Sequence, residues 1–140
     1  MFWVIKLYAV KTNKTSIRVR YGETDQMGVV YHANYVNFFE IGRTEWLRSL
    51  GYTYKSLEAS GVFLPVIGIE IDYKKYAKYD DELTVESSLI EKPNIRIQFS
   101  HKIFNQEGDL LVTGTSKLVF LDKINNRPVK CPKFLLNLID

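Results

Sequence analysis

One long helical pattern, followed by several alternating ones, constrains most strongly what this chain can fold into. Large apolar residues recur at helical spacing over about residues 34–50, and Gly51 follows them as a typical C-terminal cap. The apolar positions of this stripe are Tyr35, Phe38, Phe39, Gly42, Trp46 and Leu50. Such a stripe is buried against a second layer of structure in folded domains, so the rest of the chain must supply that layer.

The second half of the chain changes to patterns of period two, which are typical of β-strands. Turn-rich segments separate the successive patterns. Because the strands follow one another with short turns, we expect them to pair as an antiparallel meander. The predicted strands cover about residues 67–73, 83–89, 95–103 and 110–120. Outside this region we expect a first strand over about residues 16–21, a short helix over 54–60 and a last short helix over 132–140.

An α+β fold follows from these two kinds of pattern. A curved antiparallel sheet can wrap around the one long central helix, which then fills the concave face of the sheet. Gly42, on the apolar stripe, is expected to let a strand approach the helix closely. His101 lies on the apolar face of a predicted strand, and we expect a core or interface histidine with one hydrogen bond. With 140 residues, the chain is expected to form a single domain over 1–140.

Composition and charge exclude several classes of function. The net charge of +3 is modest and no run of five like charges occurs, so no nucleic-acid partner is indicated, although the positive balance suits a small anionic ligand. Two histidines and one cysteine, Cys131, offer neither a disulfide framework nor a metal-ligand spacing. The apolar run at residues 1–10 is too short to span a bilayer and lacks signal-peptide features. We therefore expect a cytoplasmic protein with no integral membrane segment and no bound metal.

Reactive polar groups gather in one loop, between the strand that ends at Tyr21 and the helix that begins near Asn34. This loop holds a carboxylate, Asp25, an imidazole, His32, and a glycine, Gly28. Loops that lead into a helix N-terminus place free backbone N–H groups beside whatever the loop presents. A carboxylate close to such donors predicts an acyl-transfer site.

The sequence around this loop resembles a known family. The matching segments are residues 19–21, 23–25, 28–35, 38–40, 43–48 and 127–129. They resemble the hotdog-fold acyl-CoA thioesterases of the 4-hydroxybenzoyl-CoA thioesterase type, closest to the branch associated with the bacterial Tol–Pal system. The resemblance covers about residues 16–138 and leaves 1–15 as an N-terminal extension. Gln26 and Met27 depart from it, because many members carry two small residues there, so an acyl preference cannot be carried over.

The resemblance implies an enzyme that hydrolyses acyl-CoA to a free acid and CoA, with no cofactor besides the CoA of its substrate. Asp25 would attack the thioester or activate a water, and the backbone N–H of His32 would stabilise the oxyanion. The His32 imidazole would touch substrate or position water. Gly28 would let the backbone turn where a side chain would block the thioester.

Neighbouring residues of the motif keep more than one interpretation. Asn34 is either the N-cap of the helix or a substrate-binding residue. Tyr31 and Tyr35 either line the acyl pocket or are core aromatics with a polar end. Glu40, farther along the helix, is expected to form an ion pair, because Asp25 makes a second catalytic carboxylate unnecessary.

Assembly and partners follow from the same resemblance. Family members are dimers or tetramers with active sites between subunits, so a homodimer or homotetramer is expected, and pairing of two sheet edges across a two-fold axis would hide their free backbone groups. Basic residues near strand ends are candidates to bind the CoA phosphates. They are Lys74, Lys75, Lys78, Lys92 and Arg96. Two other functions stay open: an acyl-carrier-protein thioesterase, and a non-catalytic scaffold or acyl-ligand-binding protein.

Overall fold

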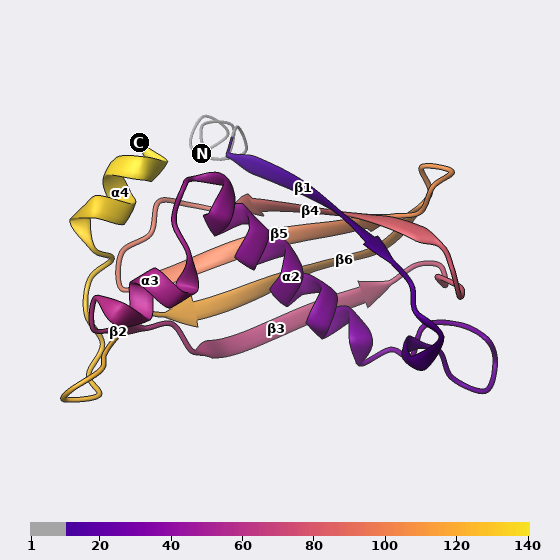
Figure 1. The fold of residues 1–140 in the computed structure, drawn as a ribbon, viewed down its shortest axis with the longest axis horizontal. Coiled ribbons are helices and arrows are strands. Elements are labelled where there is room, and N and C mark those ends of the chain that lie inside the picture. The colour runs from indigo at the N-terminus through magenta and orange to yellow at the C-terminus, as the bar shows by residue number, and fades with distance from the viewer. Residues whose placement is uncertain (1–10) are drawn as a thin grey trace.

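A curved antiparallel sheet wraps around one long helix in the computed structural model, which describes residues 11–140 (Figure 1). The apolar run at residues 1–10 lies outside the described residues. In chain order the elements are β1 (Thr12–Arg18), the 3₁₀ turn η1 (Tyr21–Glu23), α2 (Asn34–Ser49), α3 (Tyr54–Ala59), β2 (Val62–Phe63), β3 (Val66–Tyr73), β4 (Glu82–Leu89), β5 (Arg96–Phe104), β6 (Leu110–Val119), β7 (Leu121–Asp122) and α4 (Lys133–Ile139). The α+β architecture predicted from the sequence is confirmed.

The order of strands in the sheet differs from the predicted meander. The main sheet has the order β1-β4-β5-β6-β3, so only β4, β5 and β6 follow one another as neighbours. β3 pairs with β6 at one edge, and β1 pairs with β4 at the other. The expectation that β3 pairs with the next strand of the chain is therefore wrong.

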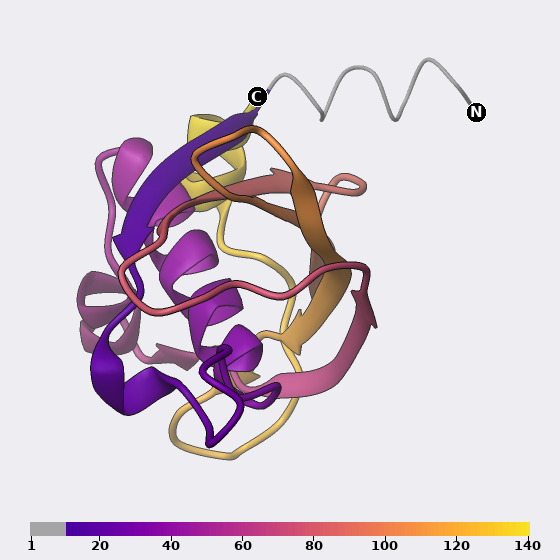
Figure 2. The ribbon, with the colours of Figure 1, turned by 90° about the vertical axis from the view of Figure 1, so that its right-hand side faces the viewer.

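The connection between β3 and β4 explains the difference. Residues 74–81 cross the end of the sheet in front of the helix instead of forming a tight turn (Figure 2). Ala77 in this connection is fully buried. Its carbonyl accepts a hydrogen bond from Val30 N–H at 2.9 Å, and its N–H donates to the Tyr35 hydroxyl at 3.3 Å. The segment is thus fixed against the start of α2, which a hairpin turn would not allow.

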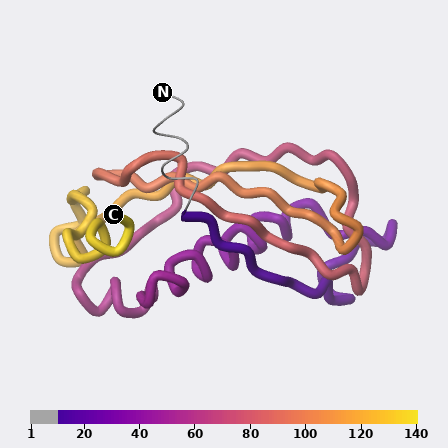
Figure 3. The backbone as a smooth tube through the Cα atoms, turned by 90° about the horizontal axis from the view of Figure 1, so that it is seen from above, coloured from indigo at the N-terminus to yellow at the C-terminus, as the bar shows by residue number. Residues whose placement is uncertain are grey.

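The helix runs along the concave face of the sheet, as the view from above shows (Figure 3). It buries Tyr35, Phe38, Phe39, Gly42 and Trp46 of its predicted apolar stripe there. Its first half packs in one cluster with β4 and β6, and its second half packs in another cluster with α4. Gly42 lies where the two layers come closest. A Cβ atom at this position would lie 2.7 Å from Val85 Cγ1 and still closer to Ser87 Oγ. The predicted close approach at Gly42 is confirmed.

His101 is fully buried between the helix and the sheet, as expected of a core histidine. It forms two hydrogen bonds instead of the one expected: Nδ1 pairs with Ser87 Oγ and Nε2 with Ser116 Oγ, both at 2.8 Å. Its ring stacks on Phe39 with 4.4 Å between centroids. Burial, helped by the positive charge of Arg43, lowers the pKa of His101 to about 3, so the ring is neutral.

The boundaries of the shorter elements shift by a few residues. β1 starts earlier than predicted and ends at Arg18, after which the chain leaves the sheet and forms η1. α4 begins directly after Pro132. Within residues 11–140, no helix has the length and apolarity needed to cross a bilayer.

Candidate active site

The loop between η1 and α2 folds back on itself in a tight turn. Gly28 N–H donates to the Asp25 carbonyl at 3.0 Å, and Asp25 N–H donates to the Val29 carbonyl at 2.9 Å. Gly28 has a φ of 78°, a backbone conformation that side chains other than glycine disfavour. An antiparallel bridge between Thr24 and Val30 closes the base of this turn. The loop therefore presents Asp25 at a defined position.

The Asp25 carboxylate is held by only one of its two oxygens. Oδ1 accepts a hydrogen bond from Met27 N–H at 2.8 Å, which orients the side chain. Oδ2 has no hydrogen-bond partner among residues 11–140. Asp25 lines a surface hollow of about 730 Å³ together with Gly28, Tyr21 and Tyr79. A carboxylate oxygen without a hydrogen-bond partner, in a residue that lines an open hollow, is available to contact a small ligand bound there.

His32 stands directly before α2 and offers a backbone donor. Its carbonyl accepts a hydrogen bond from the Tyr73 hydroxyl at 3.0 Å, which fixes the peptide. Its N–H has no acceptor among residues 11–140. The positive end of the helix dipole adds to the potential at this donor, by on the order of 0.3–1 kcal/mol for a nearby negative charge. The imidazole is exposed and lies 4.5 Å from the Tyr31 ring.

Two further residues of the motif, Asn34 and Tyr35, have structural contacts. The Asn34 amide donates to the Glu23 carbonyl at 2.9 Å, while Ala33 occupies the N-cap position of α2 without a side-chain hydrogen bond. The interpretation of Asn34 as the N-cap is therefore wrong. Tyr35 is only 2% exposed, and burial raises the pKa of its hydroxyl. In a single chain it belongs to the core.

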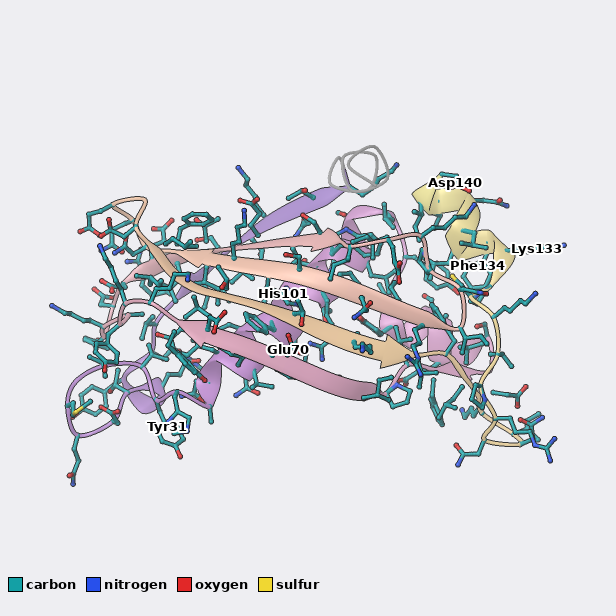
Figure 4. The ribbon with its side chains drawn as sticks, turned by 180° about the vertical axis from the view of Figure 1, so that it is seen from behind. Tyr31, Glu70, His101, Lys133, Phe134 and Asp140 are labelled. Carbon is teal, nitrogen blue, oxygen red and sulfur yellow. The ribbon has the colours of Figure 1, made fainter. Side chains whose placement is uncertain are left out.

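The candidate residues are thus brought together in part. Asp25 and Gly28 share one hollow, whose lining does not include His32. Tyr31 and His32 form an aromatic group with Tyr73, at the end of the molecule opposite to α4, whose Lys133 and Phe134 are labelled (Figure 4). The donor at His32 and the carboxylate of Asp25 flank the same short loop.

The candidate phosphate-binding cations do not gather in one chain. Lys74, Lys75 and Lys78 lie on the crossing connection near the loop. Lys92 lies at the far end, where it pairs with Asp140 at 3.3 Å, and Arg96 begins β5 at the same end. Within residues 11–140, no three histidine, cysteine or carboxylate side chains lie close enough to hold a metal ion.

Sequence reasoning passed over a buried charge on α2, Arg43. It lines a cavity of about 340 Å³ with Glu40, Tyr54 and Leu64. Glu40 forms no ion pair with any of residues 11–140, contrary to expectation. The available signal was that Arg43 stands four residues after Phe39, where a helix repeats its buried face.

Comparison with known proteins places these features in a family. A family model described as the thioesterase-like superfamily matches residues 19–139. The putative acyl-CoA thioesterase YneP of Bacillus subtilis is 38% identical over 121 residues, which make up 86% of this chain and 88% of that protein. The acyl-CoA thioesterase YbgC of Haemophilus influenzae is 39% identical over 118 residues, or 84% of this chain and 86% of that protein. A solved DHNA-CoA thioesterase from Staphylococcus aureus superposes with a TM-score of 0.82 at 33% identity, over 85% of this chain and 80% of that one.

Proposed function

The chain belongs to the thioesterase-like superfamily of hotdog-fold proteins, and from this premise we propose that it hydrolyses acyl-CoA thioesters to a free acid and CoA. One observation carries the proposal. A single short loop combines a carboxylate oxygen and a helix-entry N–H, neither of which has a hydrogen-bond partner among residues 11–140. Thioester hydrolysis requires such a pair, an oxygen nucleophile or base and a donor for the oxyanion.

Asp25 supplies the first of these groups in the proposed mechanism. In one route its free oxygen attacks the thioester carbon, the C–S bond breaks, CoA leaves as the thiolate, and water then hydrolyses the resulting anhydride to the free acid and Asp25. In the other route the same oxygen removes a proton from a water that attacks the thioester carbon directly, and CoA again leaves as the thiolate. The developing negative charge on the carbonyl oxygen is stabilised by the His32 N–H. One preorganised donor of this kind contributes about 3–4 kcal/mol to the transition state. The bond from Met27 N–H to Oδ1 leaves Oδ2 for the chemistry.

We further propose that the protein is a dimer paired through β3, because the two edges of the sheet differ in character. Strand β1 carries Lys14 and Arg18 on its exposed positions, and charged side chains of this kind protect an edge from pairing. Strand β3 also carries exposed charges, Glu70 and Asp72, but it adds an exposed apolar pair at its start, where Val66 is 43% and Ile67 49% exposed. Antiparallel pairing of β3 with its copy across a two-fold axis would cover these residues and extend the sheet.

Such a pairing would also bring cations to the loop. The loop lies at the end of the molecule where β3 finishes, and α3 and α4 lie at the end where it starts (Figure 1). A two-fold axis through β3 exchanges these ends, so the α4 end of the partner meets the loop of this chain. Exposed cations outnumber acids at the α4 end. They are Lys92, Arg96, Lys123, Arg127, Lys130 and Lys133. We propose that they attract the CoA phosphates.

The test is thiol release from short, long and aromatic acyl-CoAs by the native protein and by Asp25→Asn. Asparagine keeps an acceptor for Met27 N–H, so the loop stays folded, but it removes the charged oxygen. We expect kcat/KM to fall about 10²–10⁴-fold with an unchanged melting temperature. Asp109→Asn, at a carboxylate in a different loop, should keep native turnover.

A native rate in Asp25→Asn would remove Asp25 from the mechanism. Turnover of the same acyl groups on acyl-carrier protein, measured in parallel, separates a CoA substrate from a carrier-protein substrate. Binding of acyl-CoA with no thiol release from any ester would instead favour a non-catalytic acyl-binding role.

A further inference from the structure

Asn34 makes two contacts that join the two halves of the proposed active site. Its side-chain amide donates to the Glu23 carbonyl at 2.9 Å, and its backbone N–H donates to the Tyr31 carbonyl at the same distance. Glu23 stands two residues before Asp25, and Tyr31 stands directly before His32. Asn34 therefore connects the segment that carries the carboxylate with the peptide unit that carries the oxyanion donor.

The contact with Tyr31 fixes the direction of the His32 N–H. That N–H and the Tyr31 carbonyl belong to one peptide unit, and a peptide unit is planar. A hydrogen bond that holds the Tyr31 carbonyl therefore also orients the N–H on the other side of the same plane. The Tyr73 hydroxyl holds the His32 carbonyl, which belongs to the next peptide unit. Of these two contacts, the one from Asn34 acts on the donor's own peptide unit.

Glu23 is a fixed anchor for the side-chain contact. Its carbonyl accepts Tyr31 N–H at 2.9 Å as well as the Asn34 amide. Its carboxylate accepts Arg20 N–H at 2.7 Å and the Arg20 guanidinium at 3.4 Å, and its side chain is only 14% exposed. Because Glu23 is held at both its carbonyl and its carboxylate, the amide of Asn34 ties the start of α2 to a point that cannot easily shift.

The Asn34 amide is itself held in one orientation. Asn37, one turn farther along α2, donates from Nδ2 to Asn34 Oδ1 at 3.3 Å, which leaves the amide nitrogen of Asn34 directed at Glu23. A side chain that served only to cap α2 would accept a backbone N–H of the first turn. Among residues 11–140, the Asn34 side chain accepts no such bond. Its contact points back into the loop instead.

The hydrogen bonds inside the loop do not replace this link. The turn that presents Asp25 is closed by the bridge between Thr24 and Val30 and by the bond from Gly28 N–H to the Asp25 carbonyl. Neither contact reaches the helix. The turn and the helix are thus each held internally, and the contacts on the Glu23 carbonyl set how one lies relative to the other.

We propose that Asn34 is a positioning residue, which sets the distance between the Asp25 carboxylate and the His32 N–H by holding the Glu23 carbonyl. The inference rests on the proposed thioesterase function and gives Asn34 no contact with the substrate. Hydrolysis needs the oxygen of the nucleophile at the thioester carbon while the donor lies at the carbonyl oxygen of the same group. A displacement of about 1 Å between such groups can cost about 100-fold in rate.

The first test separates kcat from KM in Asn34→Ala and Asn34→Asp, with the acyl-CoA that the native protein hydrolyses fastest. Alanine removes the amide, and we expect kcat to fall about 10- to 100-fold with KM changed by less than about two-fold. Aspartate has the same shape but only acceptor oxygens at neutral pH, so it cannot bond the Glu23 carbonyl. Its kcat should fall at least as far as that of the alanine variant.

Asn105→Ala is the matched control for lost stability. Asn105 is also half-buried, and its Oδ1 accepts Glu107 N–H at 3.1 Å and Asp109 N–H at 2.9 Å in the turn between β5 and β6. Its loss should lower the melting temperature about as much as Asn34→Ala does and leave kcat at the native value. An equal fall of kcat in both variants would reduce Asn34 to a residue of the fold and overturn the proposal.

The second test asks whether Asn34 contacts the substrate. The same acyl-CoA is titrated calorimetrically into Asp25→Asn protein with and without Asn34→Ala. A positioning residue predicts equal Kd values within about two-fold. A direct hydrogen bond to the substrate predicts about ten-fold weaker binding and a matching rise in KM, and this result would overturn the proposal.

Hydrogen exchange, measured by mass spectrometry, tests the link without any turnover. Peptides covering residues 24–35 should exchange faster in Asn34→Ala than in the native protein, and should be unchanged in Asn105→Ala. Unchanged exchange in Asn34→Ala, or a native kcat in that variant, overturns the inference and leaves the proposed function intact. A native protein that releases no thiol from any ester overturns the proposed function, and the catalytic role of Asn34 falls with it.

Discussion

At the scale of single residues, the turn that holds Asp25 was easier to predict than the contacts of the side chains around it. Asp25 and Gly28 stand in a loop whose turn the sequence indicated, and the backbone of Gly28 has the positive φ that favours glycine. Asn34 was assigned to the wrong partner, because an amide side chain can bond any nearby carbonyl, and the carbonyl of Glu23 is brought near only by the folded loop. Arg43 was missed because its burial depends on α3, which lies eleven or more residues away in sequence.

Gly28 provides a prediction at this scale. Gly28→Ala places a Cβ on a backbone with φ of 78°, which costs about 1–2 kcal/mol even though no atom lies within 4 Å of that position. Gly28→Asn should cost less, because asparagine tolerates this conformation better. Urea unfolding measures the stability of both variants, and the rate of thiol release measures whether the altered loop still supports hydrolysis. Equal destabilisation by alanine and asparagine would show that the backbone conformation is not the cause.

At the scale of elements, the positions of the helices and strands were predictable from the sequence, but the pairing of β3 in the sheet was not. The periodicities of 3.6 and 2 are local, and they located α2 and β3 to β6 within a few residues. Which strand pairs with which is decided by the long connection over residues 74–81, whose packing against Val30 and Tyr35 leaves no period in the sequence. The close contact at Gly42 was predictable because it depends only on the stripe of the helix.

The interface between helix and sheet carries a pH dependence through His101. The folded pKa of about 3 lies below the ordinary value of 6.5, so between these values the unfolded chain binds a proton that the folded chain does not. The stabilisation is complete above pH 6.5 and is lost as the pH falls from 6.5 towards 3. Between pH 7 and pH 5 the free energy of unfolding should decrease by about 2 kcal/mol through this residue.

Urea unfolding at pH 7 and pH 5 checks this, with His101→Gln as the comparison. Glutamine does not titrate and can still bond Ser87 and Ser116, so its stability should change much less over the same interval. His32 is present in both proteins, so it does not contribute to the difference between their stability changes. An equal loss of stability in the native protein and in His101→Gln would exclude His101 as the source of the acid sensitivity.

At the scale of the whole molecule, the two free edges of the sheet are the candidate interfaces of the proposed dimer. Ile67→Lys places a charge on the apolar edge at a position that is already 49% exposed in the single chain. The subunit should still fold, but the dimer should dissociate, and thiol release should fall with it because the proposed site is shared. Sedimentation velocity and activity, measured at the same protein concentrations, test both statements.

The matched control places the same charge on the opposite edge. Ser16→Lys lies at an exposed position of β1, an edge that already carries Lys14 and Arg18. It should leave both the sedimentation and the turnover unchanged. A dimer that survives Ile67→Lys and dissociates with Ser16→Lys would move the interface from β3 to β1.

The strand order also affects how the protein can fold while it is being synthesised. Both edge strands and α2 precede β4, β5 and β6 in the chain, whereas in the sheet β4, β5 and β6 lie between the two edges. The hydroxyls of Thr12 and Ser88, 2.7 Å apart, join residues separated by 76 positions. On the ribosome, the helix and its loop therefore emerge after β1 but before β4, β5 and β6, which form the rest of the surface that covers them, and such distant contacts form slowly. Most of the apolar stripe of α2 therefore stays uncovered until β6 has emerged, and exposed apolar surface of this kind makes a nascent chain prone to aggregation.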